Sequence, residues 1–229
     1  MTHAPSSLDL LLSLDAPRRP APDEAARLLV YVQRLVDHPR PNLTAARSVE
    51  DAVSVLVVPS LAVAEAWPPT RPAPRLVVDI GSGNGFPGLA AAALWPDARV
   101  HLVERRQRKA AALAEHVAAA GFGDRVTVHA ADARELLTEG HGLVAAADLV
   151  LLRAVGPMGD TTRLAAPFVA PGGRVVHWKG PGMGPDELAE GRRVAAGLGL
   201  VEGPTQSGDG ERTLRVFERP RVERAPRRS

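Results

Sequence analysis

Residues 76–88 read LVVDIGSGNGFPG, and this stretch decides the fold. A short apolar run carries an aspartate near its end, and glycines follow at every second position, Gly81, Gly83 and Gly85. Glycine lets the backbone turn tightly and approach a ligand without a Cβ clash, and Pro87 suits the first turn of a helix. The stretch therefore predicts a strand, a loop that binds a nucleotide cofactor, and a helix.

Asp79 decides which ligand this loop favours. A G-x-G-x-x-G match at Gly83, Gly85 and Gly88 would suggest a dinucleotide such as NAD, whose pyrophosphate binds at a helix N-terminus. S-adenosylmethionine (SAM) has no pyrophosphate, but its ammonium group needs a carboxylate near the loop, and Asp79 lies two residues before Gly81. The D-x-G-x-G-x-G pattern therefore favours SAM. The alternative is a glycine-rich turn that only closes a βα unit.

The composition is typical of a globular chain with one or two domains: 229 residues, of which 45% are hydrophobic. There is no cysteine, which excludes disulfides, thiolate zinc sites and a cysteine nucleophile. The seven histidines show no metal-ligand spacing, so no metal is expected. The apolar run at residues 8–14 contains Asp9 and is too short for a signal peptide or a membrane span. We expect a cytoplasmic monomer without membrane contact.

Basic charge gathers at one end of the chain. Residues 212–229 contain seven arginines and two glutamates, a local balance of +5, although the whole chain has a net charge of only +2. Such an uneven distribution favours a phosphate-rich partner. The alternative is a solvated tail with no partner.

Three regions follow from the pattern along the chain. Residues 23–37 have apolar residues at helical spacing, and a second helical stretch begins after Ser48 and runs to Trp67, kinked or divided at Pro59. Residues 68–74, PPTRPAP, are typical of a stiff linker. We therefore predict a helical N-terminal extension with its linker at 1–74, a SAM-dependent methyltransferase domain at 75–219 and a basic tail at 220–229.

Strands and helices alternate from residue 75 onward. Predicted strands cover 76–80, 99–104, 125–130, 148–155, 172–180, 200–205 and 212–219, and predicted helices begin at Pro87 or cover 105–120, 133–138, 160–169 and 185–198. This alternation predicts an α/β, Rossmann-like methyltransferase fold: a mainly parallel seven-stranded sheet with helices on both faces. The last two strands, joined by a glycine-rich turn at 208–210, are expected to form an antiparallel pair at one edge.

Four charged residues follow predicted strands and should share one rim. In open α/β sheets the ligand binds at the carboxyl ends of the strands, where Asp79, Glu104, Asp132 and Arg153 belong. Glu104 lies 25 positions after Asp79, close to the spacing of about 20 at which a carboxylate binds ribose hydroxyls. The alternative for Glu104 is an ion pair with a neighbouring arginine. Asp132 is placed to contact the adenine edge or to cap the helix at 133–138.

Two cations are predicted near the methyl acceptor. Arg153 ends the fourth strand and Lys179 ends the fifth, so both should project toward the same cleft. A charge buried alone at a strand end is costly, so each is either functional or paired. The structural alternative is an ion pair with Asp132 or Glu104.

Several motifs together resemble the bacterial 16S ribosomal RNA guanine-N7 methyltransferases, formerly called glucose-inhibited division protein B. The motifs are NLTA at 42–45, DIGSGNGFPGL at 79–89, LVERRQRKAAAL at 102–113, RAV at 153–155, PGGR at 171–174 and WKG at 178–180. The resemblance covers most of residues 27–218. It implies SAM binding at Gly81, Phe86, Asp132, Ala133 and Arg153, and a guanine near the decoding centre of 16S rRNA or the small ribosomal subunit as the acceptor.

The chemistry implied by the resemblance suits these residues. Guanine N7 already offers an unprotonated lone pair, so no general base is expected, and Arg153 and Lys179 would act by positioning the substrate. Arg153 would orient guanine O6, a phosphate or the cofactor carboxylate. The chain departs from the family at Leu56 and Pro59, where a histidine and an aspartate are usual. Two alternatives follow: a SAM enzyme with another acceptor, or an RNA-binding protein without catalysis.

Overall fold

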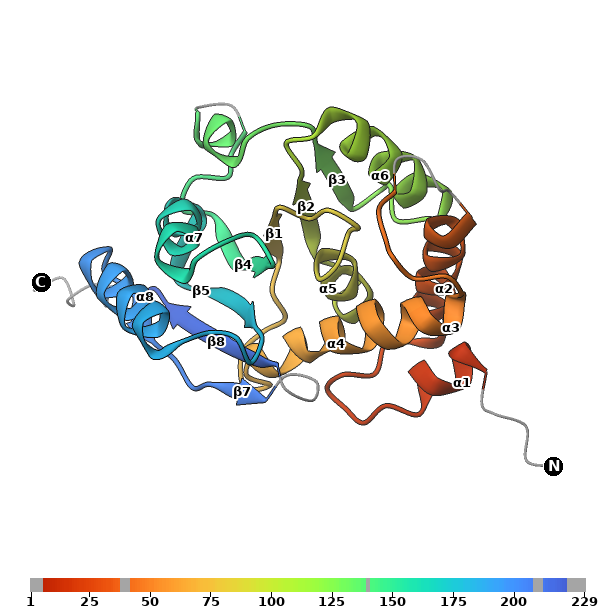
Figure 1. The fold of residues 1–229 in the computed structure, drawn as a ribbon, viewed down its shortest axis with the longest axis horizontal. Helices are drawn as coiled ribbons and strands as arrows, with labels where there is room; N and C mark the ends of the chain where they lie inside the picture. Colours follow the sequence, from red (N-terminus) through yellow and green to blue (C-terminus); the bar gives the residue numbers. More distant parts are fainter. Residues whose placement is uncertain (1–5, 38–41, 139–140, 208–211, 222–229) are drawn as a thin grey trace, which may run out of the picture.

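The computed structural model describes residues 6–37, 42–138, 141–207 and 212–221. Its centre is a twisted sheet with strand order β3-β2-β1-β4-β5-β8-β6, and a short additional strand, β7, also pairs with β8 (Figure 1). The strands are β1 (Leu76–Ile80), β2 (Arg99–Val103), β3 (Val126–His129), β4 (Ala147–Arg153), β5 (Val169–Lys179), β6 (Val201–Glu202), β7 (Gln206–Ser207) and β8 (Thr213–Glu218).

The sheet confirms the predicted mainly parallel architecture. Strands β1 to β5 run parallel to their neighbours, whereas β8 is antiparallel to β5. The antiparallel edge pair is present as β6 and β8, with β8 inserted between β5 and β6. The sequence pattern missed β7, which precedes the predicted turn; the turn itself lies outside the described residues.

Helices cover both faces of the sheet (Figure 1). The helices are α1 (Ser7–Leu12), α2 (Pro22–Asp37), α3 (Val49–Ala52), α4 (Val58–Leu61), α5 (Gly88–Leu94), α6 (Gln107–Ala119), α7 (Met158–Ala165) and α8 (Pro185–Gly197). One apolar core joins the sheet to α2, α5 and α6, and a second core lies on the face covered by α7 and α8. None of the described helices has the length and apolar character needed to cross a membrane.

The second helical stretch of the N-terminal extension changes its winding instead of breaking at Pro59. Helix α3 continues into a π-helical turn (Val53–Val57), then α4, then a 3₁₀ turn (Ala62–Ala66). Proline has no N–H to donate and its ring crowds the carbonyl four residues earlier, here that of Val55. The wider turn before Pro59 accommodates the ring, and the Val55 carbonyl accepts a hydrogen bond from Arg153 instead. The stretch is thus continuous through Pro59, and the irregularity predicted there takes the form of a change from π-helical to α-helical winding at Val58.

Side chains from the extension and its linker fasten both to the sheet. Arg71 of the linker donates to the Gly172 carbonyl (2.7 Å) and to the Glu218 carboxylate. Arg174 of β5 donates to the same carboxylate and to the Ala66 carbonyl (2.6 Å). Because these bonds join segments far apart in the sequence, the linker lies fixed against β5 and β8.

Tyr31 ties α2 to the glycine-rich loop. Its side chain is fully buried, and its hydroxyl donates a hydrogen bond to the Asn84 carbonyl at 2.8 Å. We expect Tyr31→Phe to lower the free energy of unfolding by about 1 kcal/mol, because that carbonyl loses its donor. The same change should raise the SAM dissociation constant by up to about fivefold. Urea unfolding and calorimetric titration with SAM measure the two effects.

Val30 supplies the matched control, since it lies on the same helix with 48% of its surface exposed. The substitution Val30→Ala should leave both quantities within error of the wild type. Unchanged stability in Tyr31→Phe would contradict a loop-holding role for the hydroxyl.

Candidate functional site

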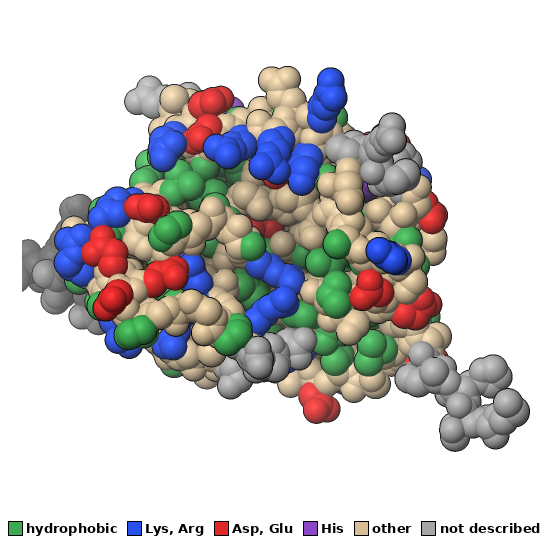
Figure 2. All heavy atoms as spheres, viewed as in Figure 1, with side chains coloured by type: hydrophobic (Ala, Val, Ile, Leu, Met, Phe, Trp, Pro, Cys, Tyr) green, Lys and Arg blue, Asp and Glu red, His purple; other side chains and the backbone are tan. Residues whose placement is uncertain are grey.

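A cavity of about 540 Å³ opens at the carboxyl ends of the parallel strands. Its walls come from the loops that follow β1, β2, β3 and β4, and Leu43 and Leu56 of the N-terminal extension close one side. Figure 2 shows the hollow near the middle of the face, bordered by basic side chains. The cavity therefore lies at the edge of the sheet where the sequence pattern predicted the ligand.

The glycine-rich loop forms one wall through Gly81, Gly83 and Phe86. Gly81 has φ +72°, and a Cβ there would lie 3.0 Å from a methyl group of Val155. Gly83 has φ +52°, and the nearest atom to a Cβ would be a backbone oxygen at 3.7 Å. Gly83 therefore gives a ligand direct access to the backbone.

Gly85 serves packing instead of the cavity wall. A Cβ at this position would lie 2.6 Å from the Tyr31 hydroxyl and 2.8 Å from Leu89, and its φ is +87°. The residue does not line the cavity. The expected ligand contact of Gly85 is thus replaced by a close approach between the loop and α2.

Asp79 lies beneath the loop and does not line the cavity. The side chains of Asp79 and Val77 are two positions apart on β1, so they face the same side of the sheet, toward α5. The carboxylate accepts a hydrogen bond from the Gly88 amide at 2.8 Å, and the residue is 1% exposed. Asp79 thus fixes the start of α5 from beneath the loop, and its role toward the cofactor ammonium stays a prediction.

Burial raises the pKa of Asp79 to about 7, although the Gly88 amide and Arg153 favour the charged form. The folded protein therefore binds this proton more tightly than the unfolded chain, and its stability falls as the pH rises from about 4 to 7. Between pH 5 and pH 7 we expect the free energy of unfolding to fall by about 2 kcal/mol through this group. Asp79→Asn should remove that slope in urea unfolding series, whereas parallel pH profiles would contradict it.

Glu104 and Asp132, which follow β2 and β3, both line the cavity. Glu104 is only 8% exposed, and its carboxylate accepts from the Arg106 amide at 2.8 Å. No ion pair joins it to Arg105 or Arg106 within the described residues. Asp132 accepts from the Arg134 amide at 3.0 Å and caps the 3₁₀ turn Ala133–Leu137, while Ala133 also lines the cavity. The two interpretations of Asp132 are thus compatible.

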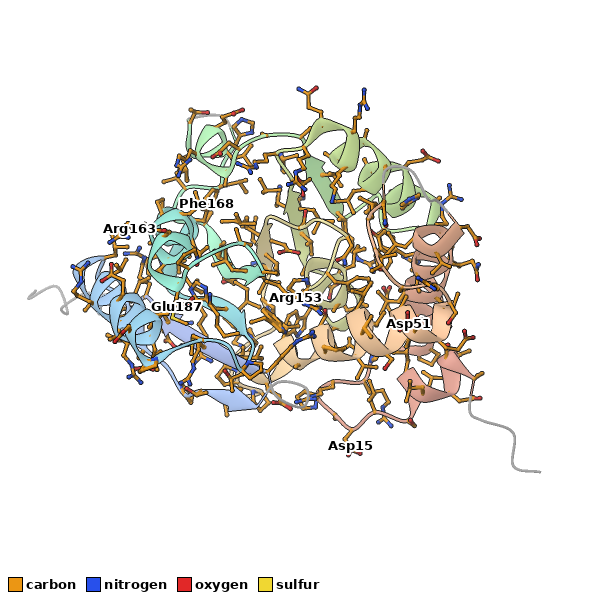
Figure 3. The ribbon with its side chains drawn as sticks, viewed as in Figure 1. Asp15, Asp51, Arg153, Arg163, Phe168 and Glu187 are labelled. Atoms are coloured by element: carbon orange, nitrogen blue, oxygen red, sulfur yellow. The ribbon has the colours of Figure 1, made fainter. Side chains whose placement is uncertain are left out.

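Arg153 points from the end of β4 toward the N-terminal extension (Figure 3). It donates to the Ser60 hydroxyl at 2.8 Å, the Val55 carbonyl at 3.0 Å and the Leu56 carbonyl at 3.3 Å. Burial, followed by the nearby Arg212, lowers the pKa of Arg153 to about 10, so the side chain stays charged at neutral pH. Within the described residues no carboxylate forms an ion pair with it. Arg153 therefore brings to the cavity wall a positive charge that has no ion pair within the described residues.

Lys179 does not join Arg153 at the cavity. Arg153 pairs in register with Trp178, so the next residue, Lys179, projects to the other face of the sheet. There its ammonium binds the Glu187 carboxylate at 2.6 Å and the Gly156 carbonyl at 2.9 Å. The expected shared cleft is wrong for Lys179 because of this alternation, and neither cation pairs with Asp132 or Glu104. Figure 3 shows Glu187 well apart from Arg153.

The histidines within strands have packing partners. His177 is 1% exposed between the hydroxyls of Thr161 and Thr162, and burial lowers its pKa to about 3. His101 Nδ1 and His129 Nε2 share a hydrogen bond of 2.8 Å. Within the described residues no group of three or more histidine or acidic side chains is placed to hold a metal ion.

Comparison with known families identifies the chain. The family model described as "rRNA small subunit methyltransferase G" matches residues 24–214. The chain belongs to this family. The match includes the glycine-rich loop, the Glu104 and Arg153 walls of the cavity and most of the N-terminal extension.

Curated relatives carry the same description over shorter stretches. A ribosomal RNA small subunit methyltransferase G from Salinispora arenicola is 36% identical over 143 residues, which is 57% of this chain and 56% of that protein. One from Deinococcus deserti is 43% identical over 88 residues, or 35% of this chain and 36% of that protein. The chain thus spans about half or less of the length of the curated relatives it matches.

Solved methyltransferase structures share the fold at low sequence identity. An O-methyltransferase family protein from Burkholderia thailandensis superposes with a TM-score of 0.53 and 20% identity, covering 93% of this chain and 67% of that chain. The pyocyanin biosynthetic protein PhzM superposes with a TM-score of 0.56 and 19% identity, covering 82% and 60%. These similarities confirm the Rossmann-like methyltransferase fold for this member of the methyltransferase G family.

The structure adds cavity residues that the sequence pattern did not select. Ser82 is 2% exposed and lines the cavity, and its hydroxyl has no hydrogen-bond partner within the described residues. Its position between two loop glycines was the available signal. Leu43 lies in the NLTA motif and Leu56 at a departure from the family pattern, but only the folded chain brings these two residues of the extension to the cavity.

Proposed function

We propose that this protein is a SAM-dependent methyltransferase that methylates N7 of a guanine in 16S ribosomal RNA near the decoding centre. One observation carries the proposal: one cavity brings together the glycine-rich loop, the buried Glu104 carboxylate and the Arg153 guanidinium in a chain of the methyltransferase G family. The proposed location is the cytoplasm, where the protein would act as a monomer on the small ribosomal subunit or its RNA.

The cavity residues fit SAM in composition. The Glu104 carboxylate suits the ribose hydroxyls, and Asp132 with Ala133 suits the adenine edge. Arg153 and the Ser82 hydroxyl, which has no hydrogen-bond partner in the described part of the chain, suit the carboxylate of the methionine part. An arginine and a hydroxyl both donate to carboxylate oxygens. Gly81, Gly83 and Phe86 would line the ligand between these ends, with Asp79 and Gly85 holding the loop from behind.

The proposed chemistry requires positioning and no general base. When SAM is bound, it supplies a methyl group to the lone pair of guanine N7. That nitrogen carries no proton, so the protein has only to align the acceptor, a contribution on the order of 7 to 11 kcal/mol in favourable cases. Arg153 is the residue whose charge would orient guanine O6, a phosphate or the cofactor carboxylate.

Lys179 would contribute as a positioning residue that acts through another segment. Its ammonium joins the Gly156 carbonyl to Glu187 and thereby holds the turn after β4. That turn carries Ala154, with φ +57°, and Val155, both of which line the cavity. The proposed role of Lys179 is to keep this wall in place.

The test is methyl transfer from labelled SAM to bacterial 30S subunits and to extracted 16S RNA, followed by nuclease mapping of the labelled base. Label on one N7-methylguanine would support the proposal. Calorimetry would verify SAM binding in the same preparation. SAM binding without label on either RNA would overturn the RNA acceptor and favour another acceptor, consistent with Leu56 and Pro59 at family histidine and aspartate positions.

A further inference from the structure

Four cationic side chains border the outer edge of the cavity. Arg105 and Arg106 precede α6, Lys109 lies in its first turn, and Arg134 follows the cap of the Ala133–Leu137 turn; all four line the cavity. Figure 2 shows a row of basic side chains along this edge, between that turn and α6. We call these four residues the basic rim.

The fold itself uses little of this charge. Within the described residues, Arg105, Arg106 and Lys109 have no ion pair, and the nearest carboxylate oxygen to Arg134 belongs to Asp132 at 3.6 Å. The Arg134 side chain is 77% exposed, so that contact contributes little. Arginines on α8 differ: Arg192 and Arg193 each bind a glutamate at 2.7–2.9 Å. Stability of the fold therefore does not explain the basic rim.

The cofactor does not account for this charge either. In the proposed function the single carboxylate of SAM lies toward Arg153 and Ser82, while Glu104 and Asp132 receive the adenosine end. Adenosine carries no anionic group, yet the basic rim lies beside Glu104 and Asp132 in the cavity wall. The excess positive charge thus faces the solvent in front of the cavity, where the acceptor has to enter.

We infer that the basic rim binds phosphates of the RNA strand that flanks the target guanine. This inference rests on the proposed function and names the surface through which its substrate is held. A guanine that reaches into the cavity brings its neighbouring nucleotides to the cavity edge, and each of them carries a phosphate. Arginine matches phosphate through two parallel N–H donors, and lysine does so as a point charge.

The experiment measures methyl transfer to extracted 16S RNA by the wild type and two charge variants. The rim variant is Arg105→Gln/Arg106→Gln/Lys109→Gln. The control variant is Arg75→Gln/Arg99→Gln, which removes exposed charges where β1 and β2 begin, at the opposite end of the strands from the cavity. Initial rates are followed against RNA concentration at several salt concentrations, and SAM dissociation constants by calorimetry.

The rim variant should raise KM for RNA by about tenfold or more. Each lost phosphate contact on a single strand lowers the slope of log affinity against log salt by about 0.7, so three contacts lower it by about 2. The SAM dissociation constant should stay within about twofold, which also shows that the variant is folded. The control variant should match the wild type in all three quantities.

The two proposals fail in different ways. If the wild type methylates 16S RNA and the rim variant keeps its KM and salt slope, the rim inference is overturned and the proposed function stands. If the wild type binds SAM and methylates no RNA, the proposed function is overturned. If the rim variant loses SAM binding, the single substitution Arg134→Gln takes its place. This substitution should lower the slope of log affinity against log salt by about 0.7 and leave SAM affinity unchanged. An unchanged salt slope in Arg134→Gln would count against the inference.

Discussion

Gly85→Ala is expected to lower the free energy of unfolding by roughly 2 to 5 kcal/mol and to weaken SAM binding with it. An alanine at φ +87° is strained, which costs about 1 to 2 kcal/mol. Its Cβ would also meet the Tyr31 hydroxyl at 2.6 Å and Leu89 at 2.8 Å, so the loop and α2 would have to separate. Urea unfolding and calorimetry with SAM measure the two losses.

Gly197→Ala is the control for this substitution. Gly197 is the last residue of α8, its φ is not positive, and a Cβ there would meet no atom within 4 Å. Alanine at this position should leave stability unchanged or raise it by up to about 1 kcal/mol, because alanine favours the helix. Equal unfolding midpoints for Gly85→Ala and the wild type would refute the tight packing behind the loop.

Arg153→Gln should weaken SAM binding by roughly 10- to 100-fold. A hydrogen bond to a charged group contributes about 1.5 to 3 kcal/mol, and 1.4 kcal/mol corresponds to a tenfold change in affinity. Glutamine removes the one charge that faces the cavity from β4, and it leaves at least one of the carbonyls of Val55 and Leu56 without its present donor. Calorimetric titration with SAM is the decisive measurement, and methyl transfer to 16S RNA should fall in parallel.

Ser60→Ala separates the charge of Arg153 from its hydrogen bonding. The Ser60 hydroxyl accepts from Arg153 at 2.8 Å, and it is a neutral partner. Its removal should cost about 1 kcal/mol of stability and leave SAM affinity within about threefold of the wild type. Equal losses in the Ser60 and Arg153 variants would mean that the guanidinium only supports the extension and does not hold the ligand.

The sheet could be predicted from the sequence because its signals are local. Apolar runs bounded by glycine, proline and charged residues located every parallel strand, and the D-x-G-x-G-x-G spacing located the cavity at the correct edge. The two-residue strand β7 was missed, since a segment of two residues is too short to show the alternation of apolar and polar residues that predicts a strand. The same local patterns gave α2 to within one residue.

Side-chain direction within the site was harder to predict. Residues that end strands share a rim, but neighbouring residues on one strand point to opposite faces. The register between β4 and β5 puts Trp178 beside Arg153 and turns Lys179 away, which the sequence does not reveal. Asp79 likewise faces α5, because it lies two positions after Val77 on β1 and alternate residues of a strand share a face. Leu43 and Leu56 lie at positions that the family resemblance had marked, but their place in the cavity wall follows from tertiary packing.

The attachment of the linker has a consequence for how the protein is made. Arg71 is synthesised 147 positions before its partner Glu218. The extension shares one apolar core with β1, β2 and β8, so α2 and α3 have no complete surface to pack on until those strands have been synthesised. Helices α2 and α3 therefore complete their packing only after β8 has been translated.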